Sequence, residues 1–217
     1  MKKLFAPDSP FAQFVTNAGT LVWINLLWLL CCIPVITVGA STAAMYRMVF
    51  NLREDKSCKT ADFFRAFASN LKQATLIWLL MPVVAFCLYL LYSAIGFYSA
   101  RVLQLAVLAA FLCFLLIAMA VALYAFPLTC YFENTLSGTL SNALTLALSR
   151  PLRTLGAMAL SLLPVAVFLF FTQAFLTLLV VFVLIVPAVL SYAIAAILRP
   201  VFEPFIPEED VPQTEED

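Results

Sequence analysis

The fold of this chain is decided by the stretch Asn25-Leu-Leu-Trp28-Leu-Leu-Cys-Cys-Ile-Pro34-Val-Ile-Thr37-Val-Gly39-Ala-Ser-Thr42-Ala-Ala-Met-Tyr46-Arg47. It starts inside an uncharged apolar run, from Leu21 to Val38, that is long enough to cross a bilayer. At Pro34 to Gly39 the run changes character, and small residues, an aromatic residue and a first cation follow. The stretch therefore predicts a membrane span that ends where a polar face begins.

The composition of the whole chain supports a membrane environment. Of its 217 residues, 65% are hydrophobic and only 11% are charged, whereas soluble domains carry about 25% charged residues. A water-soluble core of this size could not bury so much apolar surface, so lipid must be the solvent. We expect an all-α polytopic membrane protein with about five transmembrane helices and two amphipathic cytoplasmic connector helices. Residues 1–200 would form the membrane-embedded domain, and residues 201–217 an acidic, disordered tail.

Further uncharged runs supply the other spans. Ala74–Ala100 and Val102–Phe132 each suit one helix, and Pro127 is expected to kink or end the second of these. The run Thr154–Leu198 is too long for one span and suits two, with the turn near Thr172. Prolines inside spans are tolerated when neighbouring helices satisfy the backbone carbonyls that they free.

Two connectors have helical amphipathic patterns. In residues 60–72, which Thr60 would cap, Phe64, Phe67, Ala68 and Leu71 recur at helical spacing, with Arg65 and Lys72 on the other side. In residues 133–150, Leu140, Ala143, Leu144 and Ala147 form one face, with Asn142 opposite. Such helices can lie in the headgroup plane, pack on the protein's own bundle or dock on a partner, and the pattern leaves all three open.

The segment between the first span and the first connector is ambiguous. Gly39 and Ala43 are small residues four apart, a spacing that lets helices approach closely, but Gly39–Asn51 could equally be a loop or re-entrant. Asn25, the one strongly polar side chain of the first span, needs a partner on another helix. The candidate residues for helix–helix or partner interfaces are Asn25, Gly39, Thr42, Phe63, Phe64, Phe67, Asn70, Leu140, Asn142 and Leu144.

The distribution of cations predicts the topology. Placing both long connectors in the cytoplasm puts nine cations inside and three outside, which favours an outside N-terminus and a cytoplasmic C-terminus. Acidic residues contribute little to this rule, so the acidic tail is compatible with it. The connector cations expected to face the cytoplasm and its anionic headgroups are Arg47, Arg53, Lys56, Lys59, Arg65, Lys72, Arg150 and Arg153.

Several function classes lack support in the sequence. No charged residue lies within a predicted span, histidine is absent, and no Walker, HExxH or GxSxG motif occurs. The six cysteines read as small hydrophobes, because none forms a CxxC pair. We therefore expect no enzyme activity, no catalytic or metal-binding residues, no cofactor and no nucleic-acid partner.

The motifs resemble a known family. The opening block, from Asn25 to Tyr46, is similar to the N-terminal signature of YesL-type (DUF624) bacterial membrane proteins. Asp62-Phe63-Phe64-Arg-Ala-Phe67 and Phe126-Pro127-Leu, with Pro151-Leu-Arg153, resemble later blocks in the same order. The resemblance covers about residues 10 to 200. It implies a small protein of the bacterial plasma membrane, mainly of Gram-positive bacteria, encoded near carbohydrate importers of the ABC type, and it supplies no catalytic residues.

These observations give one leading hypothesis and two others. We expect a non-enzymatic protein accessory to carbohydrate uptake, whose partners are the lipid bilayer and subunits of an ABC transporter. The alternatives are a small uncoupled transporter or channel for a neutral solute, and a scaffold on the lipid surface. Oligomeric state is open, and so is a weak internal repeat in which Pro82 and Phe86 correspond to Pro164 and Phe168.

Overall fold

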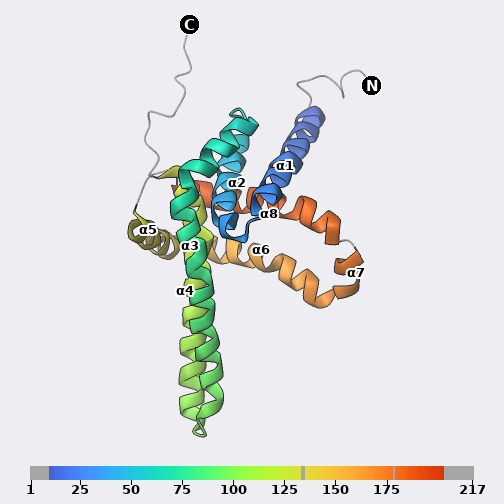
Figure 1. Ribbon diagram of the computed structural model, residues 1–217. Coiled ribbons are helices and arrows are strands. Elements are labelled where there is room, and N and C mark those ends of the chain that lie inside the picture. The colour runs from blue at the N-terminus through green and yellow to red at the C-terminus, as the bar shows by residue number, and fades with distance from the viewer. Residues whose placement is uncertain (1–9, 133–134, 178, 203–217) are drawn as a thin grey trace.

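The structure is a computed structural model that describes residues 10–132, 135–177 and 179–202 (Figure 1). The predicted acidic tail lies almost entirely outside the described residues. Throughout the described part, every regular element is a helix. In chain order these are α1 (Pro10–Cys32), η1 (Val35–Thr37), α2 (Val38–Arg53), α3 (Thr60–Ala94), η2 (Ile95–Phe97), α4 (Arg101–Tyr131), α5 (Leu136–Ser149), α6 (Pro151–Phe170), α7 (Thr172–Thr177) and α8 (Leu179–Phe202).

Five of these helices are long and apolar enough to cross a membrane, which confirms the predicted all-α fold with about five spans. They are α1, α3, α4, α6 and α8. In Figure 1, α3 and α4 form a long hairpin that extends away from α2, whereas α6 and α8 run in another direction. The outer surfaces of these helices expose many large apolar side chains, as expected where lipid is the solvent.

The helix α2 lies at the core of the fold. It contacts α1, α3, α4 and α8, and it buries most of its residues, including Met48, Val49 and Phe50. The ring of Phe50 packs edge-on against Tyr131 of α4 and Phe202 of α8. The ambiguous segment Gly39–Asn51 is therefore helical, and α2 is the packing centre for α1, α3, α4 and α8.

The first span differs from its predicted bounds, because α1 begins at Pro10 and ends at Cys32. Pro34 has no N–H group and disfavours a helical conformation of Ile33, so it favours an end of α1 before Val38. The hydroxyl of Thr37 donates to the carbonyl oxygen of Cys31 at 2.7 Å and so satisfies a group at the end of α1. The chain turns through η1 and folds back, so that Ser41 of α2 donates to the carbonyl of Trp28 at 2.9 Å.

The first connector is not a separate helix, because residues 60–72 form the start of the 35-residue α3. At 1.5 Å per residue, α3 is about 52 Å long and exceeds the ~30 Å hydrocarbon core. Its uncharged part, from Gln73 to Ala94, spans about 33 Å, which leaves the charged first third beyond the core. Thr60 is the first helical residue rather than the cap. The carboxylate of Asp62 accepts from the backbone N–H of Lys59 at 3.3 Å.

The remaining boundaries follow the uncharged runs. The helix α4 matches the predicted third span within a residue at each end and continues through Pro127 to Tyr131 rather than ending there. The long run after Thr154 divides into α6 and α8 with the short α7 between them, and α6 ends next to the predicted turn at Thr172. The second connector does form its own helix, α5. Whether either connector faces the cytoplasm stays a prediction.

Candidate binding site at the base of the hairpin

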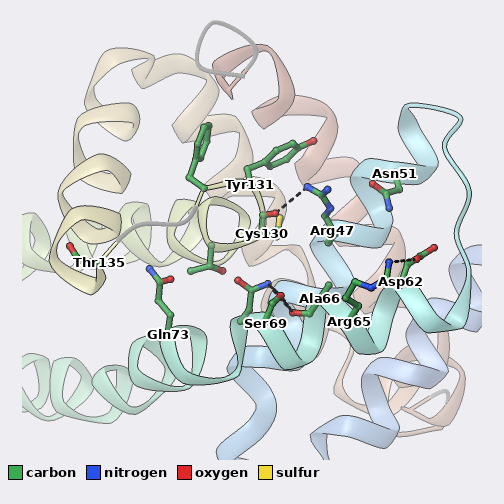
Figure 2. Close-up of a pocket in the computed structure, with 13 residues that line it drawn as sticks. Arg47, Asn51, Asp62, Arg65, Ala66, Ser69, Gln73, Cys130, Tyr131 and Thr135 are labelled. Atoms are coloured by element: carbon green, nitrogen blue, oxygen red, sulfur yellow. Dashed lines mark hydrogen bonds and ion pairs between the residues drawn. The ribbon is translucent and has the colours of Figure 1, made fainter. Parts of the chain in front are cut away.

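A polar cleft of about 710 Å³ opens where the first third of α3 faces the end of α4 (Figure 2). Most of the side chains that line it are polar or charged. They come from α2, from α3 and from the junction of α4 with α5, and include Arg47, Asn51, Asp62, Arg65, Ser69, Asn70, Gln73, Thr129, Tyr131 and Thr135. This end of the hairpin therefore offers hydrogen-bonding groups and cations to a ligand.

Arg47 is the central cation of the cleft. Its Nη1 atom donates to the carbonyl oxygen of Cys130 at 3.2 Å, and its guanidinium carbon lies 5.7 Å from the ring centre of Tyr131 (Figure 2). These contacts hold the guanidinium but use only part of its five N–H donors. Among the described residues, no carboxylate lies within 4.0 Å of it. Within the described part of the chain, the guanidinium of Arg47 therefore keeps N–H donors for an anionic group.

A second cation, Arg65, lies across the cleft on α3. Its Nη1 atom is 3.5 Å from the carboxylate of Asp62, and its side chain is 81% exposed. An exposed pair of this kind contributes little to stability, so Arg65 can turn towards a ligand at small cost. Among the described lining residues, the two cations Arg47 and Arg65 accompany one carboxylate, that of Asp62.

The amide of Gln73 forms the inner boundary of the cleft. Its Nε2 atom donates to the hydroxyl of Thr139, which is buried on α5, at 2.6 Å. Nearby, Asn70 donates to the carbonyl of Ala66 at 2.8 Å, which leaves its amide oxygen available as an acceptor. The bond between Gln73 and Thr139 keeps α3 at a fixed distance from α5.

A network behind Arg47 joins α4 to the C-terminal end of α8. The hydroxyl of Tyr131 donates to Glu54 at 3.2 Å, and Glu54 pairs with Lys56 at 3.0 Å and with Arg199 at 4.0 Å. The ring of Phe202 lies 6.1 Å from that of Tyr131. The cleft wall is therefore supported by three helices.

A second, separate cavity, an apolar groove of about 680 Å³, lies farther along the hairpin. Its lining comes from α3, α4 and the partly exposed side of α5 and is almost wholly aliphatic or aromatic. The lining includes Leu80, Met81, Val84, Leu88, Phe114, Leu115, Ala118, Ala122, Ser137, Leu140, Ser141 and Leu144. The cleft and the groove share no lining residue, and the fully buried Ile77 lies between their α3 residues.

The first third of α3 also carries an exposed face, which we call the docking face. It consists of Phe64, Arg65, Ala68, Leu71 and Lys72. Phe64 is 43% exposed and Leu71 41% exposed, so these two members of the predicted apolar face point outward. The neighbouring side of α3, where Phe63 is buried, packs against the core instead.

The candidate interface residues divide into three groups. Asn25 and Gly39 are buried between helices, and Thr42 accepts from the indole N–H of Trp28 at 3.2 Å. Phe63 is fully buried in the hydrophobic core and Phe67 packs against it, so Phe63 cannot contact a partner. The rest lie at or near the surface: Phe64 and Asn142 exposed, Asn70 in the cleft, Leu140 and Leu144 in the groove.

Asn25 and Gly39 occupy unusually tight positions. The Nδ2 atom of Asn25 donates to the carbonyl of Val183 at 2.9 Å, and its Oδ1 atom accepts from the N–H of Ala188 at 3.1 Å. A Cβ atom added to Gly39 would overlap the backbone carbonyl of Ala74 on α3. Asn25 thus joins α1 to α8, and Gly39 allows α2 to contact α3.

The predicted basic residues do not form one surface. Arg53 stacks over the ring of Tyr192 at 4.8 Å, and its buried Nε atom has no hydrogen-bond partner among the described residues. Arg153 likewise buries an unpartnered Nη1 atom, whereas Arg150 is exposed. Lys59 is exposed at the start of α3, and Lys56 is held by Glu54. Only Arg47 and Arg65 meet at the cleft.

Burial shifts two groups outside the spans. It raises the pKa of the Tyr46 phenol well above its usual range, although a hydrogen bond with Ser191 opposes the shift. Burial, together with the nearby carboxylate of Asp62, raises the pKa of the Cys58 thiol. Both groups are therefore neutral near pH 7. No cluster of three or more potential metal ligands occurs among the described residues.

Sequence reasoning missed Gln73, Tyr131 and Thr139 as site residues. The cleft joins residues 62–73 to residues 129–135, and no local pattern indicates that these segments meet. The sequence contains one relevant signal, the start of the uncharged stretch at Gln73, which marks where α3 enters the hydrocarbon core.

The helices, the lipid-exposed apolar surface and the cleft at the end of the hairpin define a polytopic α-helical membrane protein. Residues 21–92, from α1 into α3, match the model of the family described as "Protein of unknown function, DUF624", which confirms the predicted DUF624 resemblance. Comparison with curated proteins and with solved structures gave no match.

Proposed function

We propose that this chain is a non-enzymatic membrane protein that assists a bacterial carbohydrate importer by docking on its cytoplasmic surface. The observation that carries the proposal is the docking face, which exposes Phe64 and Leu71 on a part of α3 that extends beyond the hydrocarbon core. Exposed apolar patches rimmed by charge mark interaction sites, and aromatic and arginine residues are common anchors in them.

The chemistry of the face suggests the kind of partner surface. Arg65 and Lys72 flank the apolar residues, so the complementary surface would combine an apolar centre with acidic residues at its rim. The link to carbohydrate uptake comes from the resemblance to YesL-type proteins. The same proposal places the chain in the plasma membrane, with the N-terminus outside and the C-terminus in the cytoplasm.

The lining of the two cavities favours this proposal over an uncoupled transporter. A solute pathway needs polar groups along the length of the spans, as in other pores. Here the polar lining stops near Gln73 and Thr129, and the separate groove farther along the hairpin is apolar apart from Ser137 and Ser141.

Quantitative affinity purification from cross-linked bacterial membranes tests the proposal. We expect the tagged full chain to enrich permease or ATPase subunits of a carbohydrate importer. The double variant Phe64→Ser/Leu71→Ser should lose them. The control Phe97→Ser, which changes a residue that is 84% exposed at the far end of the hairpin, should keep them. Absence of importer subunits, or enrichment that survives the double variant, would reject the proposal.

A further inference from the structure

We propose that the polar cleft by itself binds a water-soluble phosphate monoester of a polyol, of the sugar phosphate class, with the phosphate held by Arg47 and Arg65. The proposal goes beyond the docking of an importer and does not depend on it. It rests on the volume of the cleft, on its depth along α3 and on the side chains that line it (Figure 2).

The cleft has the size and the position of a site for a small soluble molecule. Its volume of about 710 Å³ lies within the range of about 300–1,000 Å³ that is usual for such sites. On α3 the lining runs from Asp62 to Gln73, a rise of about 16 Å, and it ends where the uncharged part of the helix begins. A ligand would therefore reach the cleft from the water side of the hydrocarbon boundary.

No lining residue links the cleft to the apolar groove within the described part of the chain. The buried Ile77 separates the two cavities on α3, and the buried Tyr124 and Leu128 separate them on α4. At the inner end of the cleft, Gln73 donates to the buried hydroxyl of Thr139 at 2.6 Å. A ligand confined to the cleft would be polar along most of its length, which favours a soluble molecule over a phospholipid.

The two arginines suit the charge of a phosphate monoester. Arg47 comes from α2 and Arg65 from α3, so two helices each supply one cation to the cleft. Arg47 gives one N–H to the carbonyl of Cys130, and the exposed Arg65 pairs with Asp62 at 3.5 Å, so both keep donors for phosphate oxygens. A phosphate monoester carries a charge of about −1.5 to −2 near pH 7, so it can use both cations.

The side-chain amides of the cleft suit the hydroxyl groups of a polyol. The amide of Asn51 makes no side-chain hydrogen bond within the described part of the chain, so its N–H donors and its oxygen are both available. Asn70 and Gln73 bond there through their nitrogen atoms, which leaves their amide oxygens as acceptors. Amides both donate and accept hydrogen bonds, as hydroxyl groups do. The polyol would therefore contact the amides while the phosphate meets the arginines.

Isothermal titration calorimetry of the purified full chain in a neutral detergent tests the proposal. The probes are glycerol 3-phosphate, ribose 5-phosphate and glucose 6-phosphate. Glucose, inorganic phosphate and phosphatidylglycerol in mixed micelles are the comparison ligands. We expect at least one probe to bind with one molecule per chain and more tightly than glucose or inorganic phosphate. Excess phosphatidylglycerol should not displace it.

Variants of the lining separate the phosphate contacts from the polyol contacts. Arg65→Gln should weaken binding of the probe roughly three- to fivefold, and Arg47→Gln about tenfold or more, because each removes charged donors. Arg47→Lys keeps the charge but loses the forked donors, so its affinity should fall between those of the wild type and Arg47→Gln. Asn51→Ala should weaken the probe roughly threefold and leave inorganic phosphate unchanged, because it removes a contact to the polyol alone.

Two controls address charge and folding. Arg101→Gln removes an exposed cation at the opposite end of the hairpin and should leave binding unchanged. Circular dichroism checks that each variant is folded, and if Arg47→Gln is not, Arg65→Gln and Asn51→Ala decide the result. An equal loss with Arg101→Gln would overturn the proposal.

A further variant, Glu133→Gln, tests whether the chain neutralises its own cations. Glu133 follows Phe132 in the sequence and lies outside the described residues. Binding that occurs only in Glu133→Gln would mean that a carboxylate of the chain takes the place of the phosphate. That result, no binding of any probe, equal affinity for inorganic phosphate, or displacement by phosphatidylglycerol would each overturn the proposal.

Discussion

The hydrogen bonds of Asn25 predict an energetic coupling between this residue and Pro187. Pro187 has no N–H, so the carbonyl of Val183, four residues earlier in α8, loses its normal helical partner. The side chain of Asn25 donates to that carbonyl at 2.9 Å and accepts from the N–H of Ala188 at 3.1 Å. The asparagine of α1 thus satisfies the backbone groups next to the proline of α8.

The cost of removing the asparagine can be estimated from these two bonds. Hydrogen bonds between membrane helices contribute about 0.6 kcal/mol on average and up to about 1.7 kcal/mol. Asn25→Ala should therefore destabilise the fold by about 1–3 kcal/mol. Pro187→Ala supplies an N–H for the carbonyl of Val183, so in that background the same asparagine substitution should cost about 1 kcal/mol less.

Reversible unfolding in mixed micelles, followed by circular dichroism as the fraction of denaturing detergent rises, measures all four proteins of this double-mutant cycle. Leu26→Ala, at a residue of α1 that is 40% exposed, is the matched control and should show no coupling to Pro187. If Asn25→Ala lowers the free energy of unfolding equally in both backgrounds, within about 0.3 kcal/mol, Asn25 does not compensate for the N–H that Pro187 lacks, and the reasoning fails.

Three further predictions follow from other sites. Gly39→Ala should destabilise the protein by about 1–3 kcal/mol, because the new Cβ overlaps the backbone of α3. Gly156→Ala, with no atom within 4 Å of its Cβ, should be neutral or stabilising by up to about 1 kcal/mol, and the same unfolding assay compares them. Asp62→Asn should lower the raised pKa of Cys58, so its reaction with a maleimide at pH 8 should be faster; an unchanged rate would exclude the carboxylate as a cause. A lone cysteine at the exposed Ser57 should react with a membrane-impermeant maleimide in inverted vesicles and not in intact cells, and the reverse result would invert the topology.

The spans were predictable because lipid excludes charge. The uncharged run before Phe132 gave the bounds of α4 closely, and the run after Thr154 gave α6 and α8. The first span ends at Cys32, earlier than the predicted Val38, and Pro34 is the physical reason for the earlier end.

The first connector was wrongly separated from the second span. No glycine or proline separates Lys72 from Ala74, and the amphipathic and apolar segments share the same helical period, so one helix continues through both. The pattern also did not distinguish the inward side of this helix from the outward one. Phe63 enters the core and Phe64 is exposed, which depends on where α2 lies and cannot be read from α3 alone.

The cleft and the role of α2 depend on long-range packing. The cations Arg47 and Arg53 made the α2 segment resemble an exposed connector. In the fold, their charged ends reach the rings of Tyr131 and Tyr192 while the rest of the helix is buried. Contacts of this kind join residues that are tens of positions apart, so local periodicity does not indicate them.

The hydrogen bonds between α1 and α8 have a consequence for biogenesis. Asn25 and Val183 are separated by 158 positions, so the amide of the first span enters the membrane long before its acceptor has been synthesised. A nascent chain arrested ahead of α8 would keep that amide unpaired in lipid and leave one side of α2 uncovered. Synthesis of α8 is therefore the step that satisfies this amide, and chains that stop before α8 should be degraded in the membrane faster than the full chain.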